Sequence, residues 1–513
     1  MVQAMDLIAP EPHRETETPQ GPAVRALLSS WHAAVLTVIL LMPPAASATS
    51  PWTDIADPIF QHLAVDLDTP DSVDLAIAQD HDGFLWIGTQ QGLLRWDGYQ
   101  YRHYRADRNN PFALADNFIQ ALHVDSAGTL WIGTLSGGLS RYDRQHDRFS
   151  TYRSDTHSLS SIVVRAIADD GSGGVWVATN HGIDEVNASR GNVRQVGHID
   201  GDPASLPDNN VRALMRDHLG RVWIGTRRGL AYLDPSGRSL QTLEASMAPK
   251  NELNVISLYE DRDGRIWIGT RAGAYVVVPS VRGASLTLTP IQGSESDQVL
   301  SLIEAHPGEM WLGTYGNGIT VVDTTTLKST QIHHDPLLPN GLNDDTLWAF
   351  HHDAAGDIWV ATNRGVSRFD PNQHAILTLF GAATRQSGLS DNDVEAVLPL
   401  PNGRLWLGLG SSGIDVLDPF AGRVAEFHEG LDPSGRPHPL GEVRGLASSA
   451  VGEVFLCTRD ALYRKTDRDA EPVQIPLPGA MAARAVATIG TTLWLGTECS
   501  LCNCTEKVTV EMK

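Results

Sequence analysis

One motif returns along almost the whole chain and constrains its fold more than any other feature. A clear copy is DHDGFLWIGTQQGLLRWD at residues 80–97, with an Asp, a turn Gly, a Trp within an apolar run, Gly or Ala, Thr, and a second Gly. The anchors lie 44 to 49 residues apart through a degraded copy at Phe455, and the last interval is 39 residues. The tryptophan anchors are Trp86, Trp131, Trp176, Trp223, Trp267, Trp311, Trp359, Trp406 and Trp494. This period predicts a solenoid, a propeller or another repeat array.

Each repeat predicts four short antiparallel strands, because its apolar runs are brief, rich in β-branched residues and bounded by turn residues. In the third copy, Asp170 and Gly173 predict the first turn, since Asp accepts backbone N–H bonds and Gly adopts positive φ. We expect the Trp to fill the space between neighbouring blades, which is a structural role. The four expected strands are 163–169, 174–179, 182–187 and 192–198.

The order of the strands favours a closed ring over an open solenoid. The segment 58–79 already resembles an outer strand followed by an inner strand, so the chain begins with the last strand of a unit. Propellers close in this way and thereby remove exposed sheet edges. We predict an all-β protein with a seven-bladed β-propeller of four-stranded antiparallel blades at 52–380. About three blades of an incomplete second propeller follow at 381–497, and a single ring of nine or ten blades is the alternative.

The net charge is about −22, from 61 acidic and 39 basic residues, which argues against a nucleic-acid partner because phosphate binding needs a basic surface. Near the N-terminus, the apolar stretch 26–42 leads to small residues at Ala46 to Ala48. This pattern predicts a signal peptide at 1–48 and a periplasmic chain. An uncleaved anchor in the inner membrane is the alternative, since the stretch is almost long enough to span a bilayer.

The last residues, 498–513, break the repeat. Cys499, Cys502 and Cys504 are spaced as metal-binding or redox cysteines can be, but no second cluster completes such a site. We interpret the segment as an aberrant tail that lies outside the fold, as a truncated or frame-shifted reading frame would produce.

The tandem unit resembles the two-component regulator propeller repeat, carried by FLWIGTQQGLLRWDGYQYRHYRAD (84–107), TLWIGTLSGGLSRYDRQHDRFSTYRSD (129–155) and the loop pattern SLPDNNVRAL (205–214). This family occurs in the extracytoplasmic sensor part of hybrid histidine kinases and of propeller-bearing diguanylate cyclases. The resemblance implies two propellers, a β-sandwich, a membrane span and a cytoplasmic output domain. Only ten repeats are present here, so the chain resembles a sensor fragment without its output domain.

No catalytic constellation is evident, and we expect neither enzymatic activity nor a cofactor or metal. The pairs His333–His334 and His351–His352 place neighbouring side chains on opposite faces of a strand. Asp261 and Asp263 resemble the start of a calcium loop, but an apolar strand replaces the later ligands, so a hairpin turn is the better interpretation.

The remaining class of function is ligand binding. In a propeller, the starts of the inner strands and the adjoining loops form the natural ligand surface. Arginine can hold a carboxylate or sulfate bidentately, and Trp can stack on a sugar ring. We therefore expect a small extracytoplasmic ligand, either an oligosaccharide or an anion, and dimerisation is an option as in sensor proteins. The alternatives are a protein-binding scaffold and a nonfunctional remnant of a truncated sensor gene. The candidate ligand-binding residues are Gln120, Arg165, Arg212, Trp348, Glu395 and Arg444.

Overall fold

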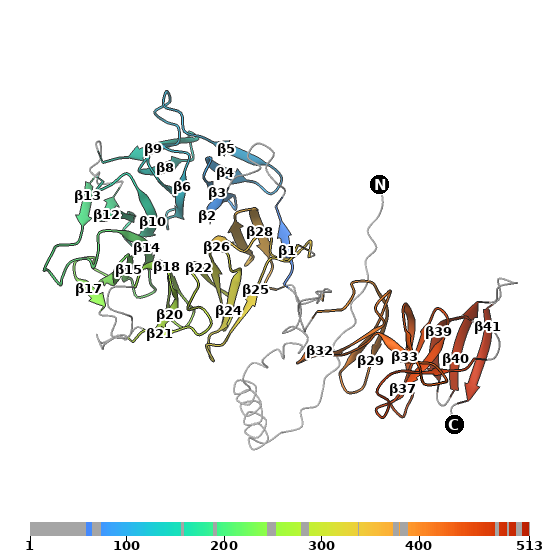
Figure 1. The fold of residues 1–513 in the computed structure, drawn as a ribbon. Coiled ribbons are helices and arrows are strands. Elements are labelled where there is room, and N and C mark those ends of the chain that lie inside the picture. The colour runs from blue at the N-terminus through green and yellow to red at the C-terminus, as the bar shows by residue number, and fades with distance from the viewer. Residues whose placement is uncertain are drawn as a thin grey trace, which may run out of the picture. The chain divides into compact units, whose positions relative to one another are not determined.

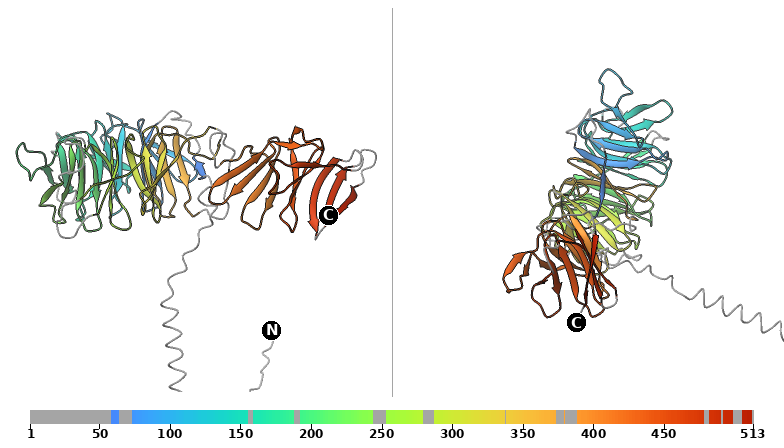
Figure 2. Two further views of the ribbon diagram at one scale, coloured as in Figure 1. Left: turned by 60° about the horizontal axis from the view of Figure 1, so that its bottom comes forward. Right: turned by 90° about the vertical axis from the view of Figure 1, so that its right-hand side faces the viewer.

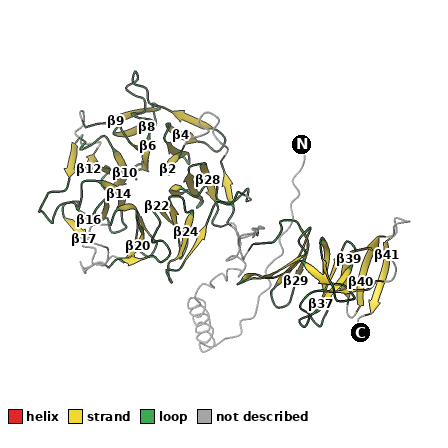
Figure 3. Ribbon diagram, viewed as in Figure 1, coloured by secondary structure: helices red, strands yellow, loops and turns green. Residues whose placement is uncertain are grey.

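A computed structural model describes most of the chain from residue 58 onward. The described residues are 58–63, 73–154, 159–187, 192–243, 253–278, 287–336, 338–372, 379, 388–477, 482–489, 492–498 and 505–511. They form strands, turns and loops and include no helix (Figure 3), so no helix among them could cross a membrane. The predicted signal peptide at 1–48 and the cysteines Cys499, Cys502 and Cys504 lie outside these ranges.

Seven four-stranded antiparallel sheets stand around one axis, with the first strand of each nearest the centre (Figure 1). Successive inner strands contact one another, and the last also contacts the first, so the ring is closed. The inner strands are β2 (Asp74–Gln79), β6 (Ile119–Val124), β10 (Val164–Asp169), β14 (Val211–Arg216), β18 (Val255–Glu260), β22 (Val299–His306) and β26 (Leu347–His352). The second strands are β3 (Leu85–Thr89), β7 (Leu130–Thr134), β11 (Val175–Thr179), β15 (Val222–Thr226), β19 (Ile266–Thr270), β23 (Glu309–Thr314) and β27 (Ile358–Thr362).

The outer two positions of each blade complete the sheets, which stand side by side when the ring is seen edge-on (Figure 2). The third strands are β4 (Leu93–Trp96), β8 (Leu139–Asp143), β12 (Gly182–Asn187), β16 (Gly229–Leu233), β20 (Gly273–Val277), β24 (Ile319–Asp323) and β28 (Gly365–Phe369). The outermost strands are β5 (Tyr101–Tyr104), β9 (Arg148–Tyr152), β13 (Asn192–Val196), β17 (Leu240–Leu243), β21 (Thr289–Pro290), β25 (Ser329–Ile332) and β1 (Phe60–His62).

The outermost strand of the last blade comes from the start of the chain. β1 pairs antiparallel with β28, with Phe60 opposite Phe369 and His62 opposite Ser367. Phe60 is fully buried and its ring packs against Trp311 and Phe369. The predicted all-β, seven-bladed propeller is confirmed, and its closure by a strand from the start of the chain follows the sequence expectation.

The motif Trp and Asp act together. The Asp80 carboxylate accepts the backbone N–H groups of Asp82 and Phe84 through one oxygen, as predicted for the turn, and the indole N–H of Trp86 through the other at 2.8 Å. The seven tryptophans of the ring are buried. Each Asp therefore shapes a turn and also satisfies the polar edge of a buried ring. The same bond joins Asp125 to Trp131, Asp217 to Trp223, Asp261 to Trp267 and Asp353 to Trp359.

Two blades depart from this pattern. In the third blade, Oδ2 of Asp170, the oxygen that accepts the indole N–H in the blades just described, accepts the hydroxyl of Ser172. In the sixth, the Trp311 indole donates to Glu309.

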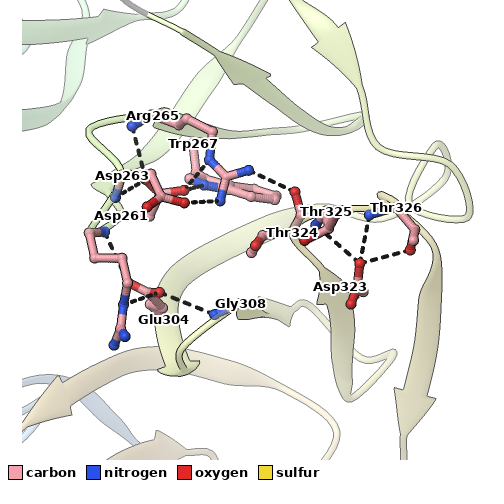
Figure 4. A network of polar contacts seen from close by, with 11 residues as sticks. Asp261, Asp263, Arg265, Trp267, Glu304, Gly308, Asp323, Thr324, Thr325 and Thr326 are labelled. Carbon is pink, nitrogen blue, oxygen red and sulfur yellow. Dashed lines mark hydrogen bonds and ion pairs between the residues drawn. The ribbon is translucent and has the colours of Figure 1, made fainter. Parts of the chain in front are cut away.

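Carboxylates on two of the inner strands also join their blades to the turn of the blade before. Glu304 accepts the backbone N–H of Arg262 at 3.0 Å and pairs with its guanidinium at 2.7 Å (Figure 4). Glu260 likewise accepts the backbone N–H of His218 at 2.8 Å. These bonds fix the spacing of neighbouring blades at the end of the ring where the Asp turns lie.

The Gly of the LWIGT run is explained by the packing of blades. A Cβ on Gly225 would lie 2.4 Å from Cγ1 of Val255, the first residue of the next inner strand, and a Cβ on Gly133 would lie 2.5 Å from Cγ1 of Val164. Because interiors are close-packed, such a position accepts only a very small residue. The motif Gly is therefore a consequence of the close contact between neighbouring blades.

Three further sheets follow the ring in sequence. The first contains β29 (Val394–Pro399), β30 (Leu405–Leu409), β31 (Ile414–Asp418) and β32 (Gly422–Phe427). The second has six strands in the order β34-β33-β38-β37-β36-β35. Its strands are β33 (Glu429–Leu431), β34 (Pro437–Pro439), β35 (Val443–Ser448), β36 (Val454–Thr458), β37 (Leu462–Lys465) and β38 (Val473–Ile475). The repeat did not predict the hairpin of β33 and β34, which adds to this blade through a parallel pairing of Leu431 with Val473.

The last sheet contains β39 (Ala482–Ile489), β40 (Thr492–Glu498) and β41 (Thr505–Glu511). β41 pairs with β40 along its whole length. The structure therefore differs from the expectation that 498–513 lies outside the fold, because a third strand forms there without the Gly and Asp positions of the repeat. Backbone pairing requires an extended segment beside an open strand edge and tolerates many sequences.

Candidate functional site

The inner strands of the ring share an irregularity at their second residue. In β14, Val211 pairs with Thr226 and Ala213 pairs with Gly225, which leaves Arg212 as an extra residue. Such a bulge bends the strand and re-aims one side chain. The register shifts at the same place in all seven inner strands. These seven bulge residues are Leu75, Gln120, Arg165, Arg212, Ile256, Leu300 and Trp348.

All six candidate residues from the sequence occupy this position. Gln120, Arg165, Arg212 and Trp348 belong to the ring and so lie on one closed set of strands. Glu395 and Arg444 are the corresponding residues of β29 and β35, outside the ring. Arg444 is engaged bidentately by Glu442, at 2.6 and 2.9 Å, and Glu395 is exposed. The structure therefore places four of the six at equivalent positions of one ring and two outside it.

The seven bulge residues divide the ring into two arcs, because their order follows that of the inner strands. Gln120, Arg165 and Arg212 stand on three consecutive strands and form the polar arc. The other four strands carry only apolar or aromatic residues, which form the apolar arc. All seven side chains are partly buried. The apolar arc is made up of Ile256, Leu300, Trp348 and Leu75.

The two arginines of the polar arc are partly buried and form no ion pair with another described residue. The Nε atoms of Arg165 and Arg212 are buried and have no hydrogen-bond partner there. Burial lowers the pKa of the Arg165 guanidinium, and the pKa of Arg212 is lowered first by burial and then by repulsion from Arg165, Arg227 and Arg271. A bound anion would relieve both effects, since it supplies hydrogen-bond acceptors and opposite charge.

Asp208 is the carboxylate that acts on Arg212, but it is paired with other groups. It raises the pKa of Arg212, and this effect is smaller than the lowering caused by burial and by the neighbouring arginines. Its carboxylate pairs with Arg228, at 3.4 Å from Nε, and accepts the backbone N–H of Asn210. Among the described residues, no carboxylate is therefore paired with Arg165 or Arg212.

A second set of residues lies beside the bulges and was missed by the sequence analysis. It consists of the residue that follows the motif Thr at the end of each second strand. The backbone N–H of Arg227 donates to the carbonyl of Asn210, and that of Arg271 donates to Asn254, so both residues sit next to the start of an inner strand. The sequence did offer a signal for this set: the residue after the motif Thr varies among the blades, whereas the Gly-Thr or Ala-Thr pair before it is shared by the seven blades.

Trp348 is held in place within the apolar arc. Its indole N–H donates to Oδ1 of Asn363 at 2.9 Å. Its ring meets Tyr315 edge-on with centroids 6.0 Å apart, and Tyr315 is 59% exposed. Both partners follow the motif Thr in their blades. An aromatic pair fixed in this way offers apolar area without much loss of side-chain freedom.

The other groups that could hold an ion are occupied by internal contacts. Asp261 accepts the backbone N–H of Asp263, both the backbone N–H and Nε of Arg265, and the Trp267 indole, which makes it a hairpin turn (Figure 4). Among the described residues, no three His, Cys, Asp or Glu side chains are grouped as metal ligands.

The comparison with curated proteins gives no significant match. In structure, the chain is similar to one described as the extracellular domain of the hybrid two-component system BT3049 from B. thetaiotaomicron, with 22% identity and a TM-score of 0.69 over 89% of this chain. It is also similar to the extracellular domain of BT4673 from the same organism, with 18% identity and a TM-score of 0.51 over 86% of this chain. The chain spans 60% and 64% of those two structures. These likenesses concern the fold.

In sequence, four segments match the family described as two-component regulator propeller, at residues 69–91, 113–136, 205–228 and 249–272. Each segment contains one inner strand, its bulge residue, the Asp turn and the second strand. The four segments belong to the first, second, fourth and fifth blades of the ring. Four of the seven blades of the ring therefore contain a segment that matches the two-component regulator propeller repeat.

Proposed function

We propose that this chain is the extracytoplasmic, ligand-sensing propeller region of a two-component or cyclic-dinucleotide signalling system. Its ligand would be a small anion or an oligosaccharide that binds at the bulge residues of the ring. The observation that carries this proposal is the pair Arg165 and Arg212, two partly buried arginines on adjacent strands whose buried Nε atoms have no partner among the described residues. By contrast, the Nε of Arg221 in the same blade as Arg212 is paired with Asp217 at 2.6 Å.

The repeats and the fold support a sensor rather than an enzyme. Segments in four blades of the ring match the two-component regulator propeller repeat, and two structures of similar fold are described as extracellular domains of signalling systems. The bulge residues supply charge, hydrogen-bonding groups and apolar surface, but no nucleophile beside a general base. We propose that the chain acts by binding, in the periplasm, and that binding is the input of the signalling system.

A screen by thermal unfolding tests this function on the full chain. A library of organic acids, sugar phosphates, sulfated and neutral oligosaccharides is added to the wild-type protein and to the double variant Arg165→Gln/Arg212→Gln. A ligand at [L] of about 100 Kd should stabilise the wild type by about 2.7 kcal/mol. The proposal expects at least one compound that raises the unfolding temperature of the wild type and not that of the double variant. Compounds that stabilise both proteins equally would place the binding site elsewhere.

A further inference from the structure

We infer, on the basis of the proposed function, that the ligand of the ring is an amphipathic organic anion. Its charged group would lie against Arg165 and Arg212, and its hydrophobic body against Ile256, Leu300 and Trp348. The inference comes from the division of the seven bulge residues into a polar and an apolar arc at one level of the ring.

The polar arc is suited to a single anionic group between two strands. β10 and β14 contact each other and carry Arg165 and Arg212 at equivalent positions. Arg212 is also repelled by Arg227 and Arg271, so positive charge is concentrated on this side of the ring. Gln120 stands next in the arc, and its buried Oε1 has no hydrogen-bond partner among the described residues. A carboxylate would accept from the guanidinium groups, and a protonated group on the ligand could donate to Gln120.

The apolar arc is unsuited to an inorganic anion or to a strongly polar sugar acid alone. Ile256, Leu300, Trp348 and Leu75 stand on four consecutive inner strands and are only partly buried. Tyr315 extends this surface and is largely exposed. Partly exposed apolar side chains at equivalent positions of neighbouring inner strands favour a ligand that covers them, since removing their surface from water is favourable.

Each simpler ligand would leave one arc unused. A sulfate ion would pair with the arginines but leave the apolar residues in water. A neutral aromatic or alkyl compound would cover Trp348 but leave two buried guanidinium groups without acceptors, which is unfavourable. A molecule with both parts would pair with the two arginines and also cover apolar residues of the other arc.

Three matched probes test this inference on the full chain by ligand-observed NMR and titration. 4-Phenylbutyrate carries both parts, butyrate lacks the aromatic ring, and 4-phenylbutyramide lacks the charge. We expect 4-phenylbutyrate to bind at least about tenfold more tightly than either truncated probe. The double variant Arg165→Gln/Arg212→Gln should lose this preference over the amide. The variant Leu300→Thr should reduce the preference over butyrate. Arg238→Gln, which removes an exposed arginine from the same ring, serves as the matched control and should bind as the wild type does.

The outcomes separate this inference from the proposed function. Equal affinity for butyrate and 4-phenylbutyrate, both lost in the arginine double variant, would overturn the amphipathic ligand while leaving an anion site at the ring. Binding of a neutral oligosaccharide alone, lost in Trp348→Ala but kept in the arginine double variant, would also overturn it and would keep a ligand site at the ring. If neither these probes nor the screening library distinguish the ring variants from the wild type, the proposed function itself fails. If the arginine double variant does not fold, Leu300→Thr still tests the inference, because this variant keeps both arginines and changes only the apolar arc.

Discussion

Gln79 and Ala354 are 275 residues apart in sequence and joined by a hydrogen bond. Oε1 of Gln79 accepts the backbone N–H of Ala354 at 2.8 Å. Gln79 ends the inner strand of the first blade, and Ala354 lies in the Asp turn of the last blade. The bond occupies the place that Glu260 and Glu304 take between other neighbouring blades. The contact that spaces blades along the chain therefore also closes the ring.

Replacing Gln79 should weaken this closure. Gln79→Ala leaves the N–H of Ala354 without its acceptor, so we expect the free energy of unfolding to fall by about 1 kcal/mol. Guanidinium denaturation of the wild type and the variant measures this. Gln91→Ala removes an exposed Gln from the same blade and should change stability by less than about 0.5 kcal/mol. Equal stability of Gln79→Ala and Gln91→Ala would show that the bond contributes nothing to closure.

Asp217 should be among the most sensitive positions in the ring. Its buried carboxylate accepts the backbone N–H of Arg221, the Nε of Arg221 and the indole of Trp223. Asp217→Ala leaves these donors buried without an acceptor, and we expect a loss of about 3–5 kcal/mol in the free energy of unfolding. Asp263→Ala, which removes a 65% exposed carboxylate from the next turn, should cost less than about 1 kcal/mol. A loss for Asp217→Ala as small as that of Asp263→Ala would contradict the buried network.

Two arginines of the same blade should respond in opposite ways. Arg221→Met removes a guanidinium that is paired with Asp217 and packed over Trp223 and Tyr232, so stability should fall by about 3 kcal/mol. Arg212→Met removes a buried charge that other arginines repel, so stability should be unchanged or should rise. Thermal unfolding in the absence of ligand measures both. A loss for Arg212→Met that matches Arg221→Met would make Arg212 a structural residue.

His351 should make the ring less stable in acid. Burial lowers the pKa of its imidazole to about 4, below the usual 6.5, because the charged form is poorly solvated there. Above pH 6.5 the imidazole is neutral in both states and stability is unaffected. As the pH falls from 6.5 to about 4, the unfolded chain binds the proton more readily, and about 3 kcal/mol of stability is lost.

The variant His351→Met isolates this effect, since Met215 occupies the same place in the inner strand of the fourth blade. Urea denaturation between pH 4 and pH 7.5 gives the difference in stability between the wild type and the variant. That difference should shift in favour of the variant as the pH falls. His181→Met removes an exposed imidazole and should follow the wild type. A constant difference between wild type and His351→Met would show that folding does not lower the pKa of His351.

The sequence by itself determined the unit of this protein. The spacing of the tryptophans, the Asp and Gly of the turns and the short apolar runs predicted four-stranded blades and seven of them in a ring. These features are local, because turn chemistry and strand alternation depend on neighbours in the chain. The start of the chain as an outer strand even predicted how the ring closes. The same local reasoning found four residues of the ring that share one position.

Only the tertiary structure decided what those positions do together. Asp80 and Trp86 were assigned separate roles from sequence, yet one carboxylate serves both the turn and the indole. The hairpin of β33 and β34 and the strand β41 follow no repeat, because backbone pairing needs an open edge more than a particular motif.

The division of the ring into arcs was also beyond the sequence. Leu75, Ile256 and Leu300 look like ordinary strand residues, and Arg227 and Arg271 like loop residues. They join Arg165, Arg212 and Trp348 only because seven bulges stand at one level and the strands that carry them close on themselves. Which side chains face a common site depends on contacts between strands about 45 residues or more apart, and such contacts arise only when the ring closes.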